Sequence, residues 1–150
     1  SDIDHDRAAG LARELGGETA AADAVMSVAC DVFSPNALGA ILADAGIARL
    51  DAPIVAGRAN NQLARAHHGA VLAGRGILYA PDYVINAGGI ISVALEYLCR
   101  RNGEPCDIND VRKRIAQIPE RLEQIWQESA RTGVWSDVVA DRMAQKLIGR

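Results

Sequence analysis

Amide side chains follow two apolar segments of this chain at places where a ligand could reach them. Asn60 and Asn61 come just after Gly57, which ends the apolar residues 54–56, and Asn86 precedes the glycine pair at 88–89. An amide can both donate and accept hydrogen bonds, so it can hold a flat polar group such as a carboxamide. Glycine lets a ligand approach the backbone closely. The same residue types are also ordinary turn and helix-capping residues, so the pattern indicates a candidate site with both interpretations open.

The elements around these amides alternate between strand and helix. Short apolar runs at 28–33, 54–56 and 77–79 are typical of buried parallel strands, and each ends at Gly, Pro or polar residues. We expect helices at 35–45, where Pro35 follows a Ser34 cap, at 62–73, and at 90–99, where apolarity nearly all round indicates burial on most sides. The fold class is therefore α/β with a doubly wound parallel sheet. Such sheets bind ligands at the carboxyl ends of their strands, so Ala37, Asn60 and Asn86 should converge on one hollow.

Further helices are expected at both ends of the chain. The spacing of Ala8, Leu11, Ala12 and Leu15 predicts a first amphipathic helix, with Asp2, Asp4 and Asp6 as possible capping carboxylates. A small strand at 19–21 and a helical turn at 23–26 should follow. Beyond the surface turn at 103–105 we expect a helix from Val111 that Pro119 kinks or splits, and a last helix after Gly133.

Composition excludes several classes of function. A net charge of -3 without a dense basic run, and only 4% aromatic residues, argue against nucleic-acid binding. No apolar stretch reaches the roughly 20 residues of a spanning helix. The cysteines are too few and too irregular for a disulfide framework or a zinc site, so we expect reduced thiols, a cytoplasmic location and no metal. The histidines are interpreted as solvated or capping residues, with the adjacent pair on different helix faces: His5, His67 and His68.

Three long motifs in register resemble those of one enzyme family. They read CDVFSPNALGA at 30–40, VAGRANNQLA at 55–64 and YAPDYVINAGG at 79–89. Their sequence and order are similar to the amino-acid dehydrogenases that act on leucine, valine, phenylalanine and, more distantly, glutamate. The resemblance implies a Rossmann-like NAD-binding domain. It also implies a parent enzyme that oxidatively deaminates an apolar L-amino acid to its 2-oxo acid and ammonia, with NAD as cofactor.

The resemblance also implies roles for individual residues. Asp2 matches the acidic residue that binds the adenine-ribose hydroxyls, and a carboxylate there would repel a 2′-phosphate and favour NAD over NADP. The implied cofactor-binding set is Asp2, Ile3, Ala37, Leu38, Ala59, Asn60 and Asn61. The implied substrate-binding set is Asn60, Ile90 and Val93, the last two lining a pocket for a branched aliphatic side chain. Ser34, Asn36 and Arg58 depart from the family's usual residues.

Two features of such an enzyme are missing from the sequence. There is no GxGxxG turn, and the only lysines, Lys113 and Lys146, fall in the C-terminal helices. We therefore expect residues 1–150 to be a partial NAD-binding domain that lacks its first strand and glycine turn and carries a helical extension from about 100 to 150. It should hold no catalytic residue and be inactive alone. Its expected partners are an N-terminal catalytic domain, the amino-acid substrate and further copies in a homo-oligomer.

Two other functional classes stay open at this point. The fold could serve a non-catalytic domain that binds a nucleotide or metabolite and regulates, because fold does not fix function. A purely structural interaction module would be favoured if Asn60 and Asn86 pointed into the protein.

Overall fold

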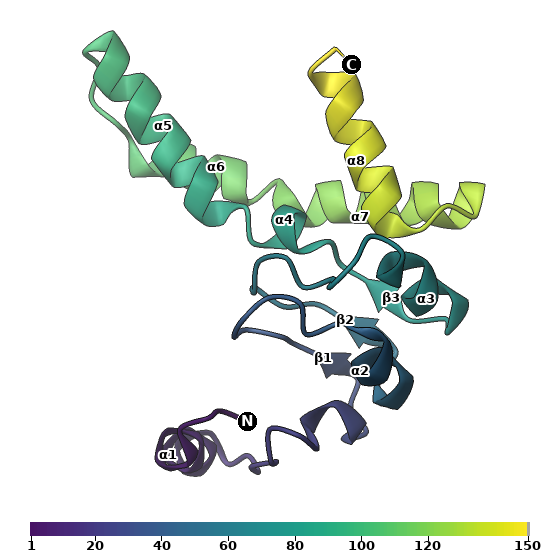
Figure 1. Cartoon of the computed structure of the whole chain (residues 1–150). Coiled ribbons are helices and arrows are strands. Elements are labelled where there is room, and N and C mark those ends of the chain that lie inside the picture. The colour runs from purple at the N-terminus through teal and green to yellow at the C-terminus, as the bar shows by residue number, and fades with distance from the viewer. Residues whose placement is uncertain (150) are drawn as a thin grey trace.

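A small parallel β-sheet lies in the middle of the molecule (Figure 1). The computed structural model describes residues 1–149, so Arg150, the end of the predicted domain, lies outside the described residues. Within that range the sheet contains β1 (Val32–Phe33), β2 (Ile54–Val55) and β3 (Leu78–Tyr79), in the order β1-β2-β3. Both pairings are parallel. The predicted mixed α/β fold with a parallel sheet is confirmed, with strands shorter than predicted.

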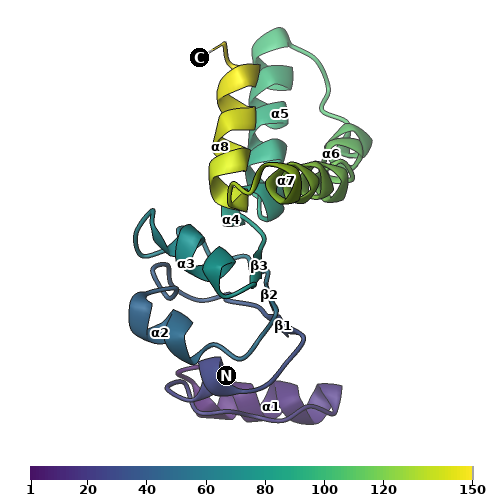
Figure 2. The same ribbon diagram turned by 90° about the vertical axis from the view of Figure 1, so that its right-hand side faces the viewer.

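The register of the sheet puts one row of side chains into the core. Phe33, Val55 and Tyr79 are aligned across the strands and buried, while Val32 and Leu78 on the opposite face are exposed. Two helices cover the buried row from one side, α2 (Asp44–Arg49) and α3 (His68–Gly74) (Figure 2). The core between these layers consists of Met26, Phe33, Leu42, Ile47, Leu50, Ala52, Val55, Leu72, Ile77 and Tyr79. Met26 comes from a short 3-10 helix, η1 (Val25–Ser27), close to the predicted helical turn.

The first helix forms as predicted but lies at one end of the molecule. α1 (His5–Leu15) starts after Asp4, whose side chain accepts from the backbone N–H of Arg7, and ends at Gly16 in the left-handed conformation. None of its residues is buried, and Leu15 is 72% exposed. Local capping therefore fixes where this helix begins and ends, because packing within residues 1–149 contributes little.

The C-terminal third is helical, as expected. After α4 (Asp82–Ile85) come α5 (Gly88–Asn102), α6 (Ile108–Ile115), α7 (Ile118–Thr132) and α8 (Ser136–Leu147). α7 and α8 pack together around a second core of Ile125, Val139 and Ala140. Pro119 stands in the first turn of α7, where its missing N–H costs nothing, so the predicted split of the helical run is confirmed. No helix in the described residues is long and apolar enough to cross a membrane.

The predicted burial of α5 is wrong. Not one of its 15 residues is buried, and Ile90, Val93 and Tyr97 are each more than 60% exposed. The helix packs against α6 and extends away from the sheet (Figure 1). Apolarity on all sides predicts burial only when other elements surround a helix, and along α5 the described chain supplies α6 alone as a major packing partner.

Three local predictions are also wrong. Residues 35–43 form an irregular loop instead of a helix, and 19–21 form no strand. The helix predicted from 62 begins only at His68. For residues 35–43 and 62–67 the reason is contact between the two segments: the backbone N–H of Ala40 donates to the carbonyl of Asn61 at 2.7 Å, and Leu42 pairs with Leu63 in a β-bridge. These long-range bonds replace the helical bonds that the local sequence favours.

Candidate functional site

Two amides from separate loops meet at the carboxyl edge of the sheet. Nδ2 of Asn86 donates to Oδ1 of Asn60 at 2.6 Å and to the carbonyl of Arg58 at 3.3 Å. A helix-capping role for Asn86 on α5 is not what forms, because Ala87 occupies the N-cap and receives no side-chain bond. The pair opens onto a hollow of about 390 Å³ lined by Arg58, Asn60, Ile85, Asn86, Gly88, Gly89, Ile115 and Ile118.

A second hollow lies at the end of β1. Its volume is about 420 Å³, and it gathers Asp2, Ile3 and Ala37 with Phe33 and the 34–36 turn. Oδ1 of Asp2 accepts from the backbone N–H of Asp4 at 3.0 Å, whereas Asp4 itself caps α1. Asp2 is therefore not the helix cap, and it brings a carboxylate to the wall of this hollow.

Asn36 connects the two hollows. Its Oδ1 accepts from the backbone N–H of Arg58 at 3.2 Å, and its Nδ2 donates to the carbonyl of Ser34 at 2.9 Å. Arg58 lines the first hollow and Ser34 the second. The tips at Ala37, Asn60 and Asn86 thus share one edge of the sheet, but they line two neighbouring hollows rather than the single one expected.

The remaining residues of the implied site lie in different surroundings. Leu38 is 85% exposed, and Ala59 is buried with its N–H donating to the carbonyl of Pro35 at 3.0 Å. Asn61 adopts a left-handed conformation with φ 53°. Ile90 and Val93 lie on the exposed surface of α5, outside the residues that line the amide hollow. The bonds that hold Ala59 and Asn61 in place are made by their backbones.

Two buried polar side chains that the sequence did not single out hold the loop after β2. Nε2 of Gln62 donates to the carbonyls of Gly57 and Ala59, at 2.5 and 2.9 Å. The carboxylate of Asp82 accepts from the backbone N–H of Asn61 and from the hydroxyl of Tyr79. Burial, together with the charge of Asp82, raises the pKa of Tyr79, so its hydroxyl remains a donor. An acidic residue directly after a strand and a proline was the available signal for Asp82.

One known protein family matches nearly the whole chain. Residues 5–146 match the family of glutamate/leucine/phenylalanine/valine dehydrogenases. The chain belongs to this dehydrogenase family. The resemblance found in three sequence motifs is thereby confirmed.

Individual relatives of the dehydrogenase family match nearly the whole chain. The leucine dehydrogenase of Thermoactinomyces intermedius is 41% identical over 148 residues, which are 99% of this chain and 39% of that protein. The phenylalanine dehydrogenase of Lysinibacillus sphaericus is 40% identical over 137 residues, 90% of this chain and 34% of that protein. The crystal structure of L-tryptophan dehydrogenase from Nostoc punctiforme superposes with a TM-score of 0.90 at 38% identity, covering 99% of this chain and 43% of that one. The chain thus spans about two fifths of the length of these relatives.

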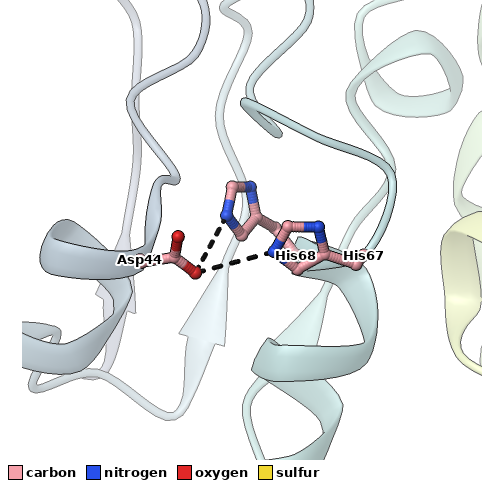
Figure 3. A group of neighbouring side chains, drawn as sticks. All are labelled: Asp44, His67 and His68. Atoms are coloured by element: carbon pink, nitrogen blue, oxygen red, sulfur yellow. Dashed lines mark hydrogen bonds and ion pairs between the residues drawn. The ribbon is translucent and has the colours of Figure 1, made fainter.

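This dehydrogenase-family chain also has a histidine pair for which the prediction of solvated or capping residues holds at His67, half-exposed at the N-cap of α3, and is wrong at His68. His68 is not solvated: it is 1% exposed, and its Nε2 lies 3.2 Å from Oδ1 of Asp44 (Figure 3). Nε2 of His67 lies 3.6 Å from the same oxygen, so both rings face one carboxylate and not different directions. Partial desolvation opposes ionisation of Asp44, but hydrogen bonding and electrostatic attraction from the two histidines lower its pKa.

The same three groups have the spacing of a metal-ligand set. Nδ1 of His68 accepts from the backbone N–H of Arg65 at 3.0 Å, which leaves the ring proton on Nε2 facing Asp44. A metal at Nε2 would have to displace this proton, and both ring nitrogens would then be deprotonated while Nδ1 accepts from Arg65. The cluster is therefore a hydrogen-bonded bridge between α2 and α3.

Proposed function

We propose that this chain is the NAD-binding part of an amino-acid dehydrogenase. The observation that carries the proposal is the contact of Asn60 with Asn86 at the carboxyl edge of a parallel sheet, beside a second hollow walled by Asp2. Edges of this kind are where α/β domains bind dinucleotides. Membership of the dehydrogenase family and the names of the relatives support the parent activity.

The residues present fit the two ends of a dinucleotide. A carboxylate at Asp2 suits the two hydroxyls of an adenine ribose and opposes a 2′-phosphate, which supports NAD over NADP. The amides of Asn60 and Asn86 suit the carboxamide of a nicotinamide, which needs both a donor and an acceptor. When bound, NAD supplies the acceptor for the hydride of the amino acid's α-carbon. The part of this chain itself is to bind NAD and to orient it.

The substrate proposed is an apolar L-amino acid, converted to its 2-oxo acid and ammonia. Relatives named for leucine, phenylalanine and tryptophan support an apolar side chain. Ile90 and Val93 present exposed apolar surface that such a side chain could contact once the rest of the enzyme is in place. We further propose that a separate catalytic domain supplies the lysines of the reaction, that the enzyme is a cytoplasmic homo-oligomer, and that this segment alone is inactive.

Turnover by the full-length protein tests the proposal. Formation of NADH is followed with leucine, valine, phenylalanine and glutamate, each with NAD and with NADP. We expect activity with NAD and an apolar amino acid, and a rise in the KM for NAD when Asp2 is replaced by Ala. Binding of NAD without turnover of any amino acid would instead favour the regulatory alternative. Absence of both would contradict the proposal.

A further inference from the structure

Asp82 connects the two loops that carry the amide pair. It is the first residue of α4 and only 8% exposed. Both of its oxygens are used: Oδ1 accepts from the hydroxyl of Tyr79 at 3.0 Å, and Oδ2 accepts from the backbone N–H of Asn61 at 2.7 Å. The second bond is charge-assisted and short, which makes it stronger than an ordinary amide bond. The loop after β2 is thus fixed to the segment after β3.

The backbone at Asn61 needs such a restraint. Its φ of 53° lies in the left-handed region, which a residue other than glycine adopts at a cost unless its surroundings hold it there. The carboxylate of Asp82 holds the N–H, and the N–H of Ala40 binds the carbonyl of the same residue at 2.7 Å. These two bonds fix the backbone direction next to Asn60.

The position of Asp82 in the chain fixes the other half of the pair. Asp82 starts α4, and Asn86 directly follows that helix, with its backbone N–H donating to the carbonyl of Asp82 at 2.9 Å. One residue therefore holds the neighbour of Asn60 through its side chain and Asn86 through its backbone. The 2.6 Å contact between the two amides depends on both connections.

We propose that Asp82 is a positioning residue of the dehydrogenase site: its bond to the Asn61 N–H sets Asn60 against Asn86 and so fixes the amides that face cofactor and substrate. This inference rests on the proposed function. Asp82 lies outside the residues that line the amide hollow, so it acts through Asn61.

Three variants of the full-length protein test it. Asp82→Ala removes both bonds. Tyr79→Phe removes the bond to Oδ1 and leaves the bond to Asn61, so it serves as the matched control for lost stability. Asp82→Asn keeps an acceptor for the Asn61 N–H and can donate its amide hydrogen to the Tyr79 hydroxyl. kcat and both KM values are measured for each, alongside circular dichroism and thermal melting.

A positioning role for Asp82 and a purely stabilising role predict different kinetic results for these variants. We expect Asp82→Ala to lower kcat/KM about 10- to 100-fold and to raise the KM for NAD and amino acid, because an error of about 1 Å at a reacting group costs up to about 100-fold. Tyr79→Phe should melt earlier but stay within about threefold of wild-type kcat/KM. Asp82→Asn should retain most of the kcat/KM that Asp82→Ala loses.

Each contrary result has a distinct meaning. If Asp82→Ala lowers kcat with both KM values unchanged, or loses no more than Tyr79→Phe, the positioning role is refuted while the dehydrogenase function stands. A wild-type protein that forms no NADH refutes the proposed function itself.

Discussion

Gly39 gives the sharpest test of how closely the 35–43 loop packs against the loop after β2. A Cβ at this position would lie 2.6 Å from the carbonyl oxygen of Asn60 and 2.9 Å from that of Asn61. An ordinary contact begins at about 3.4 Å. Gly39→Ala therefore forces the loop after β2 to move away from position 39 by about 0.8 Å. The contact of Asn60 with Asn86, now 2.6 Å, would then stretch to the limit of a hydrogen bond, about 3.2 Å, or beyond it.

The expected cost of Gly39→Ala has two parts. Overpacking destabilises by about 1–3 kcal/mol, which a thermal melt reports as an earlier transition. Displacement of Asn60 should lower kcat/KM for NADH formation by about 10- to 100-fold, since an error approaching 1 Å is large for a positioned group. Initial rates with NAD and leucine measure this loss in the full-length protein.

Gly74→Ala is the matched control for Gly39→Ala. Among the described residues nothing lies within 4 Å of a Cβ built on Gly74, the last residue of α3. The control should melt slightly later, because glycine costs roughly 0.5–1 kcal/mol relative to alanine in a helix, and its activity should not change. Wild-type rates and an unchanged melt in Gly39→Ala would refute the tight contact between the loops.

Three further substitutions test individual buried groups by thermal melting. Gln62→Glu loses the donor that binds the carbonyls of Gly57 and Ala59, so it should destabilise by at least about 1–3 kcal/mol at pH 8 and recover partly on acidification, when the carboxyl regains a proton. An equal loss of melting temperature in Gln62→Glu at pH 8 and at acidic pH would contradict this. Ser136→Ala should cost only about 1 kcal/mol, because Trp126 still donates to the carbonyl of Tyr79 that Ser136 binds; a loss several times larger would show that Trp126 does not compensate. Burial raises the pKa of Asp137 in the folded protein. Ionisation of this carboxyl therefore lowers the free energy of unfolding as pH rises through that pKa. Asp137→Asn should therefore melt later than wild type at pH 8, with the gain vanishing towards pH 4, and a gain independent of pH would rule out this cause.

Local signals in the sequence were sufficient for the type of most elements and for several boundaries, but not for residues 19–21 and 35–43. Parallel strands were predictable from short apolar runs that end in glycine or polar residues. Asp4 and Gly16 delimit α1, and Pro119 marks the start of α7, because each acts through backbone bonds within one turn. That Asn60 and Asn86 share an edge followed from the parallel arrangement alone.

What could not be predicted depends on contacts between distant residues. Ser34 and Pro35 favour a helix start locally, yet residues 35–43 form an irregular loop that is hydrogen-bonded to the 57–61 loop. The buried His68 contacts Asp44, 24 residues away, and nothing in its immediate neighbourhood indicates that partner. The side chain of Asn36 reaches the backbone of Arg58, 22 residues away, between the two hollows, and no spacing rule encodes that contact.

The loop after β2 is held mainly through hydrogen bonds of its backbone. Its restraints include the backbone of Arg58 bound to Asn36, the backbone of Ala59 bound to Pro35, the buried amide of Gln62, and the backbone of Asn61 bound to Asp82. None of these bonds uses the side chain at position 58, which is exposed and borders the amide hollow. Saturation mutagenesis at that one codon should therefore yield a library of folded variants, in which selection for new amino-acid specificity could proceed without first having to repair the scaffold.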